Sequence, residues 1–295
     1  MPAPLLVCGQ VNVETVFRLP VSGWSPQGGF FPGALGLGVS GVGANLARAL
    51  TRLGSPVRLL TFAGEDEAGR LVRAAFADVD AHFLPAPATP QSLALVSADG
   101  AHAFYRDLKG LEDAPAPLEA ARALLPGCAA ALLTNVGWTR ELLPLAGAAG
   151  VPILTDVQDV RSLDNPYDAP YFAAADVLLL SAAHLPDPAA LLRALPGRSP
   201  ARVLIAGLGA GGALLLERGG EIVHQPAFPV GASFAGGAGD TLAAAFAHFH
   251  FTRALPPLEA LRLACAAAAL KLRGGGSGQG HPSEEETRAF ARSPG

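Results

Sequence analysis

Four short apolar segments in the second half of this chain constrain its fold more than any other feature. Each is a short run of mostly apolar residues, and helical segments or loops separate one from the next. A strand that is apolar on both sides has to be covered on both faces, and strands that alternate with helices are typical of a parallel sheet. They therefore predict an α/β fold with a doubly wound, mostly parallel sheet flanked by helices. The segments are residues 129–134, 151–156, 177–180 and 203–206.

The first 110 residues carry a different pattern. Residues 5–8 form another short apolar segment, which predicts a first buried strand. Two stretches after it are typical of hairpins: a region rich in Gly, Pro and aromatic residues between positions 24 and 37, and strand-like segments on either side of Asp99-Gly100. Two hairpins outside the alternating pattern predict a small β-sheet that stands off the large one.

Composition narrows the class of protein. The chain has 295 residues, of which 50% are hydrophobic and 16% charged, enough for one α/β domain with a large core. The net charge of -4 gives no basic footprint for nucleic acid, and no apolar stretch approaches the length of a membrane span. No signal peptide is recognisable, and Cys8, Cys128 and Cys265 are widely spaced in apolar surroundings. We therefore expect reduced thiols in a cytoplasmic protein that has no nucleic-acid or membrane partner.

Near the C-terminal end, a loop of small residues leads directly into an apolar helix. Residues 236–239 read Gly-Gly-Ala-Gly, and Leu242, Phe246 and Phe249 then fall on one helical face. Glycines let a ligand approach the backbone, and the first N–H groups of a helix carry the positive end of its dipole. Such a loop predicts an anion pocket. Asp240 is its one charged residue, which either compensates the dipole or acts as a general base.

Further polar residues stand where ligands bind in this class of fold. Asn135 follows one apolar segment and Asp156 ends another, so both stand at the carboxyl ends of predicted strands. Asn12 and Glu14 share one side of an alternating strand, which is either a solvated face or a binding face. Asn45, just after the Gly41-Val-Gly43 turn, is either a helix cap or a ligand contact.

A second glycine-rich turn follows the segment 203–206. Residues 207–212 read Gly-Leu-Gly-Ala-Gly-Gly, which superficially offers the turn of a dinucleotide-binding fold. A predicted strand at 213–216 follows it in place of a helix, so a dinucleotide site is excluded. The pattern of a P-loop is also absent from the chain.

Taken together, Gly-Ala-Gly-Asp240-Thr before an apolar helix and Gly41-Val-Gly-Ala-Asn45 at the start of another resemble the ribokinase-like sugar kinases of the phosphofructokinase-B type. The resemblance runs from residue 5 to about residue 288. It implies one kinase domain over residues 1–295, with a β-sheet lid formed by about 10–39 and 82–107. It also implies ATP and Mg²⁺ as cofactors, a small-molecule substrate and a homodimer through the lid.

The same resemblance implies roles for individual residues. Asp240 is the catalytic base, and Gly237, Ala238 and Gly239 bind the transferring phosphate. The nucleotide contacts are Ser181, Gly207, Gly209 and Gly212. The substrate contacts are Asn12, Glu14, Gly41, Asn45, Arg106 and Asn135, although a surface role for Arg106 is equally consistent with its sequence position. Val42 stands at a variable position where Lys indicates a phosphosugar, which favours an unphosphorylated substrate.

The chain departs from the family's pattern at its cation sites. An Asp-Thr pair that helps bind a monovalent cation in many members is replaced by Phe234 and Ala235. The Asn-x-x-Glu motif that organises Mg²⁺ is replaced by Ser181 and His184. We therefore assign no metal ligand and expect Mg²⁺ to be held through water and ATP phosphates, with Asp156 as a helper.

These observations predict an ATP-dependent kinase that phosphorylates a hydroxyl of a sugar or sugar-like substrate. Two alternatives remain open. Trp24, Phe30 and Phe31 in the lid would suit a nucleobase if they are not simply lid core, which keeps a nucleoside kinase of the same fold open. The replaced cation motifs are equally compatible with a catalytically weak ligand-binding protein on this fold.

Overall fold

The computed structural model describes residues 2–21, 29–98, 102–231, 236–274 and 278–292. A nine-stranded sheet runs through its centre in the order β13-β12-β11-β10-β9-β8-β1-β4-β5. The seven strands from β11 to β5 are parallel, and β12 and β13 are antiparallel additions at one edge. The strands are β1 (Leu5–Cys8), β4 (Val57–Ala63), β5 (Asp80–Pro85), β8 (Ala130–Leu133), β9 (Ile153–Asp159), β10 (Val177–Ser181), β11 (Val203–Gly207), β12 (Ala213–Glu217) and β13 (Ile222–Gln225).

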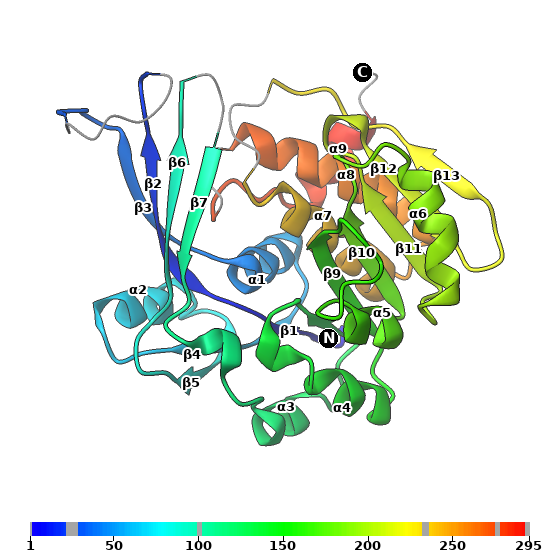
Figure 1. Ribbon diagram of the computed structural model, residues 1–295, viewed down its shortest axis with the longest axis horizontal. Coiled ribbons are helices and arrows are strands. Elements are labelled where there is room, and N and C mark those ends of the chain that lie inside the picture. Colours follow the sequence, from blue (N-terminus) through cyan, green and yellow to red (C-terminus); the bar gives the residue numbers. More distant parts are fainter. Residues whose placement is uncertain (1, 22–28, 99–101, 232–235, 275–277, 293–295) are drawn as a thin grey trace.

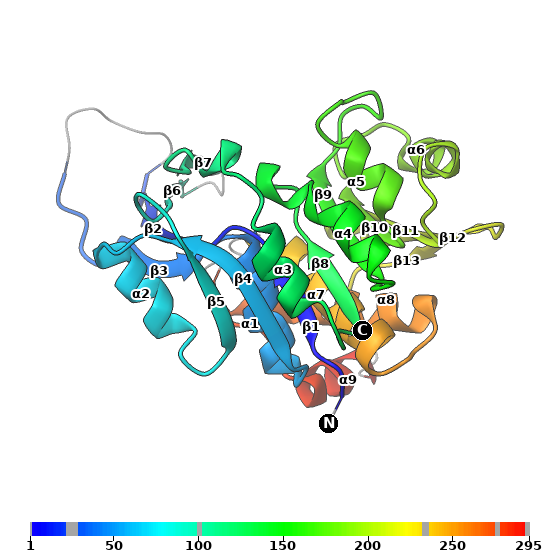
Figure 2. The same ribbon diagram turned by 90° about the horizontal axis from the view of Figure 1, so that it is seen from below.

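Helices cover both faces of this sheet, as the apolar segments predicted (Figures 1 and 2). Alternate residues of β1 show the two layers: Leu5 and Val7 pack in one hydrophobic cluster, and Leu6 and Cys8 pack in the other. The first cluster includes residues of α1, α2, α7, α8 and α9, and the second includes residues of α3 to α6. The helices are α1 (Val42–Leu53), α2 (Glu67–Ala75), α3 (Leu118–Leu124), α4 (Leu142–Ala148), α5 (Ala169–Ala174), α6 (Pro188–Ala194), α7 (Ala238–Ala247), α8 (Pro257–Arg273) and α9 (Glu284–Arg292). Short 3-10 turns occupy Leu111–Asp113, Gly137–Thr139, Leu195–Gly197 and Gly209–Gly211, and a π turn occupies His248–Thr252.

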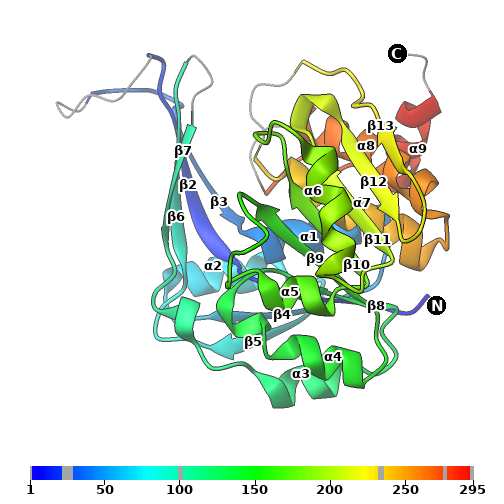
Figure 3. The ribbon, with the colours of Figure 1, turned by 45° about the vertical axis from the view of Figure 1, so that its right-hand side comes forward.

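A separate four-stranded sheet stands beside the large one (Figure 3). Its order is β3-β2-β6-β7, from β2 (Asn12–Arg18), β3 (Leu35–Ser40), β6 (Gln91–Val96) and β7 (His102–Asp107). Both hairpin regions therefore contribute to it. The second stretch had been expected to begin at residue 82, but β5 pairs in parallel with β4 in the large sheet. The small sheet thus takes up its second stretch only at Gln91.

Two residues end or begin helices on this side of the fold, and the three cysteines are unpaired. Gly54 ends α1 in the left-handed conformation, at φ 90°, which glycine adopts without steric cost. Asp66 caps α2 and accepts a hydrogen bond from Gly69 N at 2.8 Å, which is a structural role. Cys8, Cys128 and Cys265 are free thiols. No helix within the described ranges is long and apolar enough to cross a membrane. Trp24, the Asp99-Gly100 turn, Phe234 and Ala235 lie outside the described residues.

Candidate active site

Two clefts meet at the N-terminal end of α7. The first, here called the polar cleft, has a volume of about 380 Å³ and lies between the small sheet and the carboxyl ends of the central strands. The second, here called the apolar cleft, has a volume of about 600 Å³ and extends along β10, β11 and α8. All six predicted substrate contacts line the polar cleft with Gly237 and Asp240, and all four predicted nucleotide contacts line the apolar cleft with Ala238 and Gly239.

The small sheet supplies one wall of the polar cleft. Asn12 and Glu14 are 8% and 6% exposed, so the interpretation of a solvated strand face is wrong. Asn12 Nδ2 donates to Ser92 Oγ at 2.7 Å, and Ser92 Oγ donates to Glu14 Oε2 at 3.2 Å. Ser92 belongs to β6, which pairs with β2, so the two strands hold an amide and a carboxylate in fixed positions. Arg106, on β7, is exposed at the margin of the same cleft.

The start of α1 approaches the opposite side of the cleft. Gly41 has a φ of 101°, and a Cβ there would lie 2.5 Å from Gln10 O and 2.7 Å from Asn12 Oδ1. Only glycine therefore fits at this turn. Asn45 lies within α1 rather than at its cap, so the cap interpretation is wrong. Its Nδ2 donates to Asp240 Oδ2 at 2.6 Å.

Two buried side-chain oxygens in the polar cleft have no hydrogen-bond partner within the described part of the chain. These are Asn45 Oδ1 and Thr134 Oγ1. Buried polar atoms are normally paired, because an unpaired one loses its interactions with water and gains nothing in return. Both atoms are therefore suited to bind a hydroxyl group of a ligand.

Asp240 lies in the first turn of α7, half-buried between the two clefts. Desolvation raises the pKa of its carboxyl to about 7, and the negative charge of Asp156 adds to this shift. The hydrogen bond from Asn45 and the charges of Lys271 and Arg106 act in the opposite direction. A carboxyl group with a pKa near neutrality exchanges protons readily, as a general base requires.

The backbone at the start of α7 fits the predicted anion pocket. Gly237 precedes the helix in the left-handed conformation at φ 78°, and the hydrogen bond from Thr241 N to Gly237 O closes the first turn at 3.0 Å. The N–H groups of Ala238 and Gly239 come before that bond, where helical donors have no intrahelical acceptor. A Cβ at Gly239 would meet nothing within 4 Å. Packing therefore does not demand glycine there, and its small size leaves the approach to these N–H groups open.

Sequence reasoning missed Lys271. This residue of α8 is 1% exposed, and desolvation lowers its pKa to about 8, while the negative charge of Asp240 acts to raise it. Its signal in the sequence is a cation placed four residues after Ala267, on the buried face of a largely apolar helix. Lys271 thus brings positive charge close to the Asp240 carboxyl.

We expect Lys271→Met to move the acidic limb of the pH profile of kcat/KM upward by about one unit, because removing a nearby cation disfavours the Asp240 carboxylate. Initial rates between about pH 5 and 9 measure the shift. Lys109→Met is the matched control, because Lys109 pairs with Asp107 outside both clefts. If the acidic limb of the kcat/KM profile stays at the same pH in a folded Lys271→Met variant, this ammonium does not act on Asp240.

Near the ends of β9 and β10 lie the side chains that could hold Mg²⁺ beside the apolar cleft. His184 Nδ1 lies 2.8 Å from Asp159 Oδ1, so this histidine has its own carboxylate partner. No cluster of three or more metal-binding side chains occurs in the described residues. Asp156 lines the apolar cleft, half-buried. One carboxylate fits Mg²⁺, which usually keeps several waters and binds proteins through one or two carboxylates together with substrate phosphates.

The apolar cleft has the lining expected for a nucleotide base beside an anion pocket. Leu179, Ile205 and Leu242 contribute apolar surface, and Ser181 and Gly207 lie at the strand ends. Gly212 has a φ of 93°, and a Cβ there would lie 2.1 Å from Gln225 O. The turn between β11 and β12 therefore requires glycine at this position.

Comparison with known proteins shows the family of the chain. Residues 32–284 match the sequence pattern of the pfkB family of carbohydrate kinases. The chain belongs to this family. It is a carbohydrate kinase, and it transfers phosphate to a hydroxyl group. An acarbose 7(IV)-phosphotransferase from an Actinoplanes species is 30% identical over 268 residues, which cover 86% of this chain and 87% of that protein.

Solved structures of pfkB-type kinases share the fold. A microbiome-derived acarbose kinase superposes with a TM-score of 0.91 at 21% identity, over 99% of this kinase and all of that chain. A ribokinase II from E. coli, in complex with ATP and Mg²⁺, superposes with a TM-score of 0.80 at 20% identity over 98% of both chains. At these identities the likeness concerns the fold, and the confirmed part of the prediction is a ribokinase-like α/β fold with a small additional sheet.

Proposed function

We propose that this pfkB-family kinase phosphorylates a hydroxyl group of an unphosphorylated sugar or sugar-like acceptor, with Asp240 as the general base. The observation that carries this proposal is the position of the Asp240 carboxylate. It lies where the polar and apolar clefts meet, is held by Asn45, and stands at the positive end of α7. A base in this position can reach an acceptor on one side and a phosphate donor on the other.

The reaction we propose is a single transfer. Asp240 accepts the proton of the acceptor hydroxyl as that oxygen forms its bond to the γ-phosphorus of ATP and the bond to the β-phosphate oxygen breaks. The N–H groups of Gly237, Ala238 and Gly239, with the dipole of α7, stabilise the negative charge on the transferring group. Most of the rate enhancement is expected from positioning and electrostatics, as is usual for phosphoryl transfer.

In this proposal the polar cleft orients the acceptor. Asn12, Glu14 and Asn45 offer amide and carboxylate groups to sugar hydroxyls, and Asn135 does so from the end of β8. Gly41 keeps the cleft open beside Asn12. Arg106 approaches from the small sheet, which we propose acts as a lid over a single domain of 295 residues.

The apolar cleft would hold ATP, with Ser181, Gly207, Gly209 and Gly212 around its phosphates or base. Mg²⁺, when bound, supplies charge neutralisation to the phosphates, and Asp156 is the side chain suited to hold it through water. The family relation supports both cofactors.

The relatives favour a sugar over a nucleoside. The 30% identical relative is an acarbose phosphotransferase. Phe31 packs against Phe17 with ring centroids 5.8 Å apart, Phe30 is 91% exposed, and neither lines the polar cleft. Of the three lid aromatics that would have suited a nucleobase, Phe30 and Phe31 thus lie outside the polar cleft and Trp24 lies outside the described residues, whereas Phe104 and Tyr167 do line the cleft.

A panel experiment tests the proposed function. ADP release from Mg·ATP would be followed with D-ribose, D-fructose, D-glucose, acarbose, adenosine and inosine as acceptors. We expect stimulation by a sugar and none by the nucleosides. Stimulation by a nucleoside alone would replace the sugar proposal, whereas tight binding of a sugar without ADP release would favour a binding protein.

We also propose a homodimer formed through the small sheet. Leu35 and Leu37 of β3 are 68% and 64% exposed, and Phe30 lies close to them in the chain. Exposed apolar side chains gathered in this way commonly mark an interface. A monomeric mass in light scattering would exclude the dimer.

A further inference from the structure

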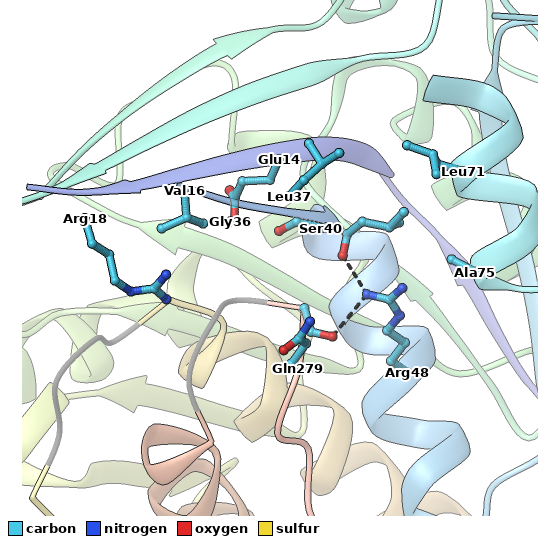
Figure 4. Close-up of a pocket in the computed structure, with 13 residues that line it drawn as sticks. Glu14, Val16, Arg18, Gly36, Leu37, Ser40, Arg48, Leu71, Ala75 and Gln279 are labelled. Atoms are coloured by element: carbon cyan, nitrogen blue, oxygen red, sulfur yellow. Dashed lines mark hydrogen bonds between the residues drawn. The ribbon is translucent and has the colours of Figure 1, made fainter. Parts of the chain in front are cut away.

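Beside the polar cleft lies a third hollow of about 360 Å³, here called the β3 hollow. Its walls come from β2, β3, α1, α2 and residues 278–279. In Figure 4, Glu14, Val16 and Arg18 extend from β2 toward Arg48 and Gln279 across the hollow. None of the roles proposed above uses this space.

The β3 hollow adjoins the polar cleft directly. Glu14 and Ser40 line both of them, so the two hollows share part of their walls. Glu14 is also the carboxylate that accepts the hydrogen bond from Ser92 in the polar cleft. A ligand in the polar cleft would therefore meet the edge of the β3 hollow at Glu14.

Two glycines create the space. In the β2–β3 pairing, Gly38 stands opposite Glu14 and Gly36 stands opposite Val16. Directly paired residues in an antiparallel sheet point to the same face, so the absence of two side chains leaves that face open beside β2. Neither glycine has a positive φ. A Cβ at Gly38 would meet nothing within 4 Å, and one at Gly36 would meet only Arg18 Nη1, at 3.7 Å.

Backbone conformation and packing therefore do not demand glycine at either position. Glycine inside a strand weakens it, and it often marks a place where a ligand or another backbone approaches closely. The open space at Gly36 and Gly38 is consistent with that second role, because it faces the hollow.

The lining matches the chemistry of a sugar ring. Val16, Leu71 and Ala75 offer apolar surface to the C–H face of a ring, while Glu14, Arg18 and Gln279 offer groups that bind hydroxyls. Arg48 Nη1 donates to Val39 O at 2.6 Å and to Gly278 O at 3.1 Å, which fixes this guanidinium at the wall. Glu14 offsets part of the positive charge of Arg18 and Arg48, and all three side chains can bond to hydroxyl groups.

We propose that the β3 hollow is a second saccharide subsite, which binds a further ring of an acceptor whose reacting ring lies in the polar cleft. The natural acceptor is then a saccharide of two or more rings. This inference rests on the proposed function for the place of the reacting ring.

Filling the hollow tests the proposal. Gly38→Leu and Gly36→Leu each add a side chain that projects into it, and Gly197→Leu is the matched control, because a Cβ at Gly197 also meets nothing within 4 Å and lies outside the three clefts. The probes are D-glucose, maltose, maltotriose and acarbose. Binding is measured by calorimetry, and kcat and KM are measured from ADP release.

We expect the wild type to bind a multi-ring sugar about tenfold or more tightly than D-glucose, and each glycine variant to remove most of that advantage by raising KM. The control should keep it. Equal binding of one-ring and multi-ring sugars, no binding of any multi-ring sugar, or an unchanged advantage in a folded Gly38→Leu variant would overturn the proposal.

The same data separate this inference from the proposed function. Suppose that a multi-ring sugar binds to the wild type, fails to bind to Gly38→Leu and is never phosphorylated. That result supports the subsite and contradicts the assigned reaction. If a sugar is phosphorylated and its KM is the same in the wild type and in both glycine variants, the result supports the reaction and contradicts the subsite.

Discussion

Replacement of Asp240 by Asn is expected to lower kcat by about 10²- to 10⁴-fold, because the amide keeps the shape of the side chain and cannot accept the hydroxyl proton. The new amide can still contact Asn45, so the fold and the binding of ATP should persist. The rate of ADP release with a saturating acceptor measures the first effect, and calorimetric titration with ATP measures the second.

Asp78→Asn is the control for this substitution, because Asp78 is an exposed carboxylate that lines none of the three hollows. Its rate should match that of the wild type. An Asp240→Asn enzyme with a rate within a few-fold of wild type, while folded and able to bind ATP, would show that another group takes the proton.

Activity is expected to rise steeply with pH and to level off above about 7, the pKa of the Asp240 carboxyl. The base works only when deprotonated, and burial raises its pKa, so acidification removes the active form. Below the pKa, kcat/KM should fall about tenfold per pH unit, which makes it roughly 100-fold lower at about pH 5 than on the plateau. An Asp with an ordinary pKa would instead stay active down to about pH 4 to 5.

Protonation of ATP also occurs in the acidic range, so the profile needs an internal comparison. The residual activity of Asp240→Asn shares every titration except that of the base, and its profile should lack the limb near pH 7. Two identical profiles would assign the limb to the substrate. Asn45→Ala should move the limb to higher pH, because the hydrogen bond from Asn45 lowers the Asp240 pKa.

Much of the fold could be predicted because its signals are local. The apolar segments at 129–134, 151–156, 177–180 and 203–206 correspond to β8 to β11, since a strand covered on both faces is apolar over most of its length. The glycine loop before α7 was equally visible. The extent of the small sheet was predicted less well, because nothing in residues 80–85 indicates whether that strand pairs with β4 or with β6.

In the candidate site, too, some features were visible in the sequence and others were not. The sequence by itself determined which residues carry chemistry, since Asp240 among glycines and Asn45 after a glycine turn are patterns of neighbouring residues. Only the tertiary structure decided that Asn45 contacts Asp240 across 195 positions, that Lys271 is buried near them, and that Gly36 and Gly38 open a hollow opposite Glu14 and Val16. The physical reason is that periodicity and turns depend on adjacent residues, whereas charge environment and open space depend on which elements pack together.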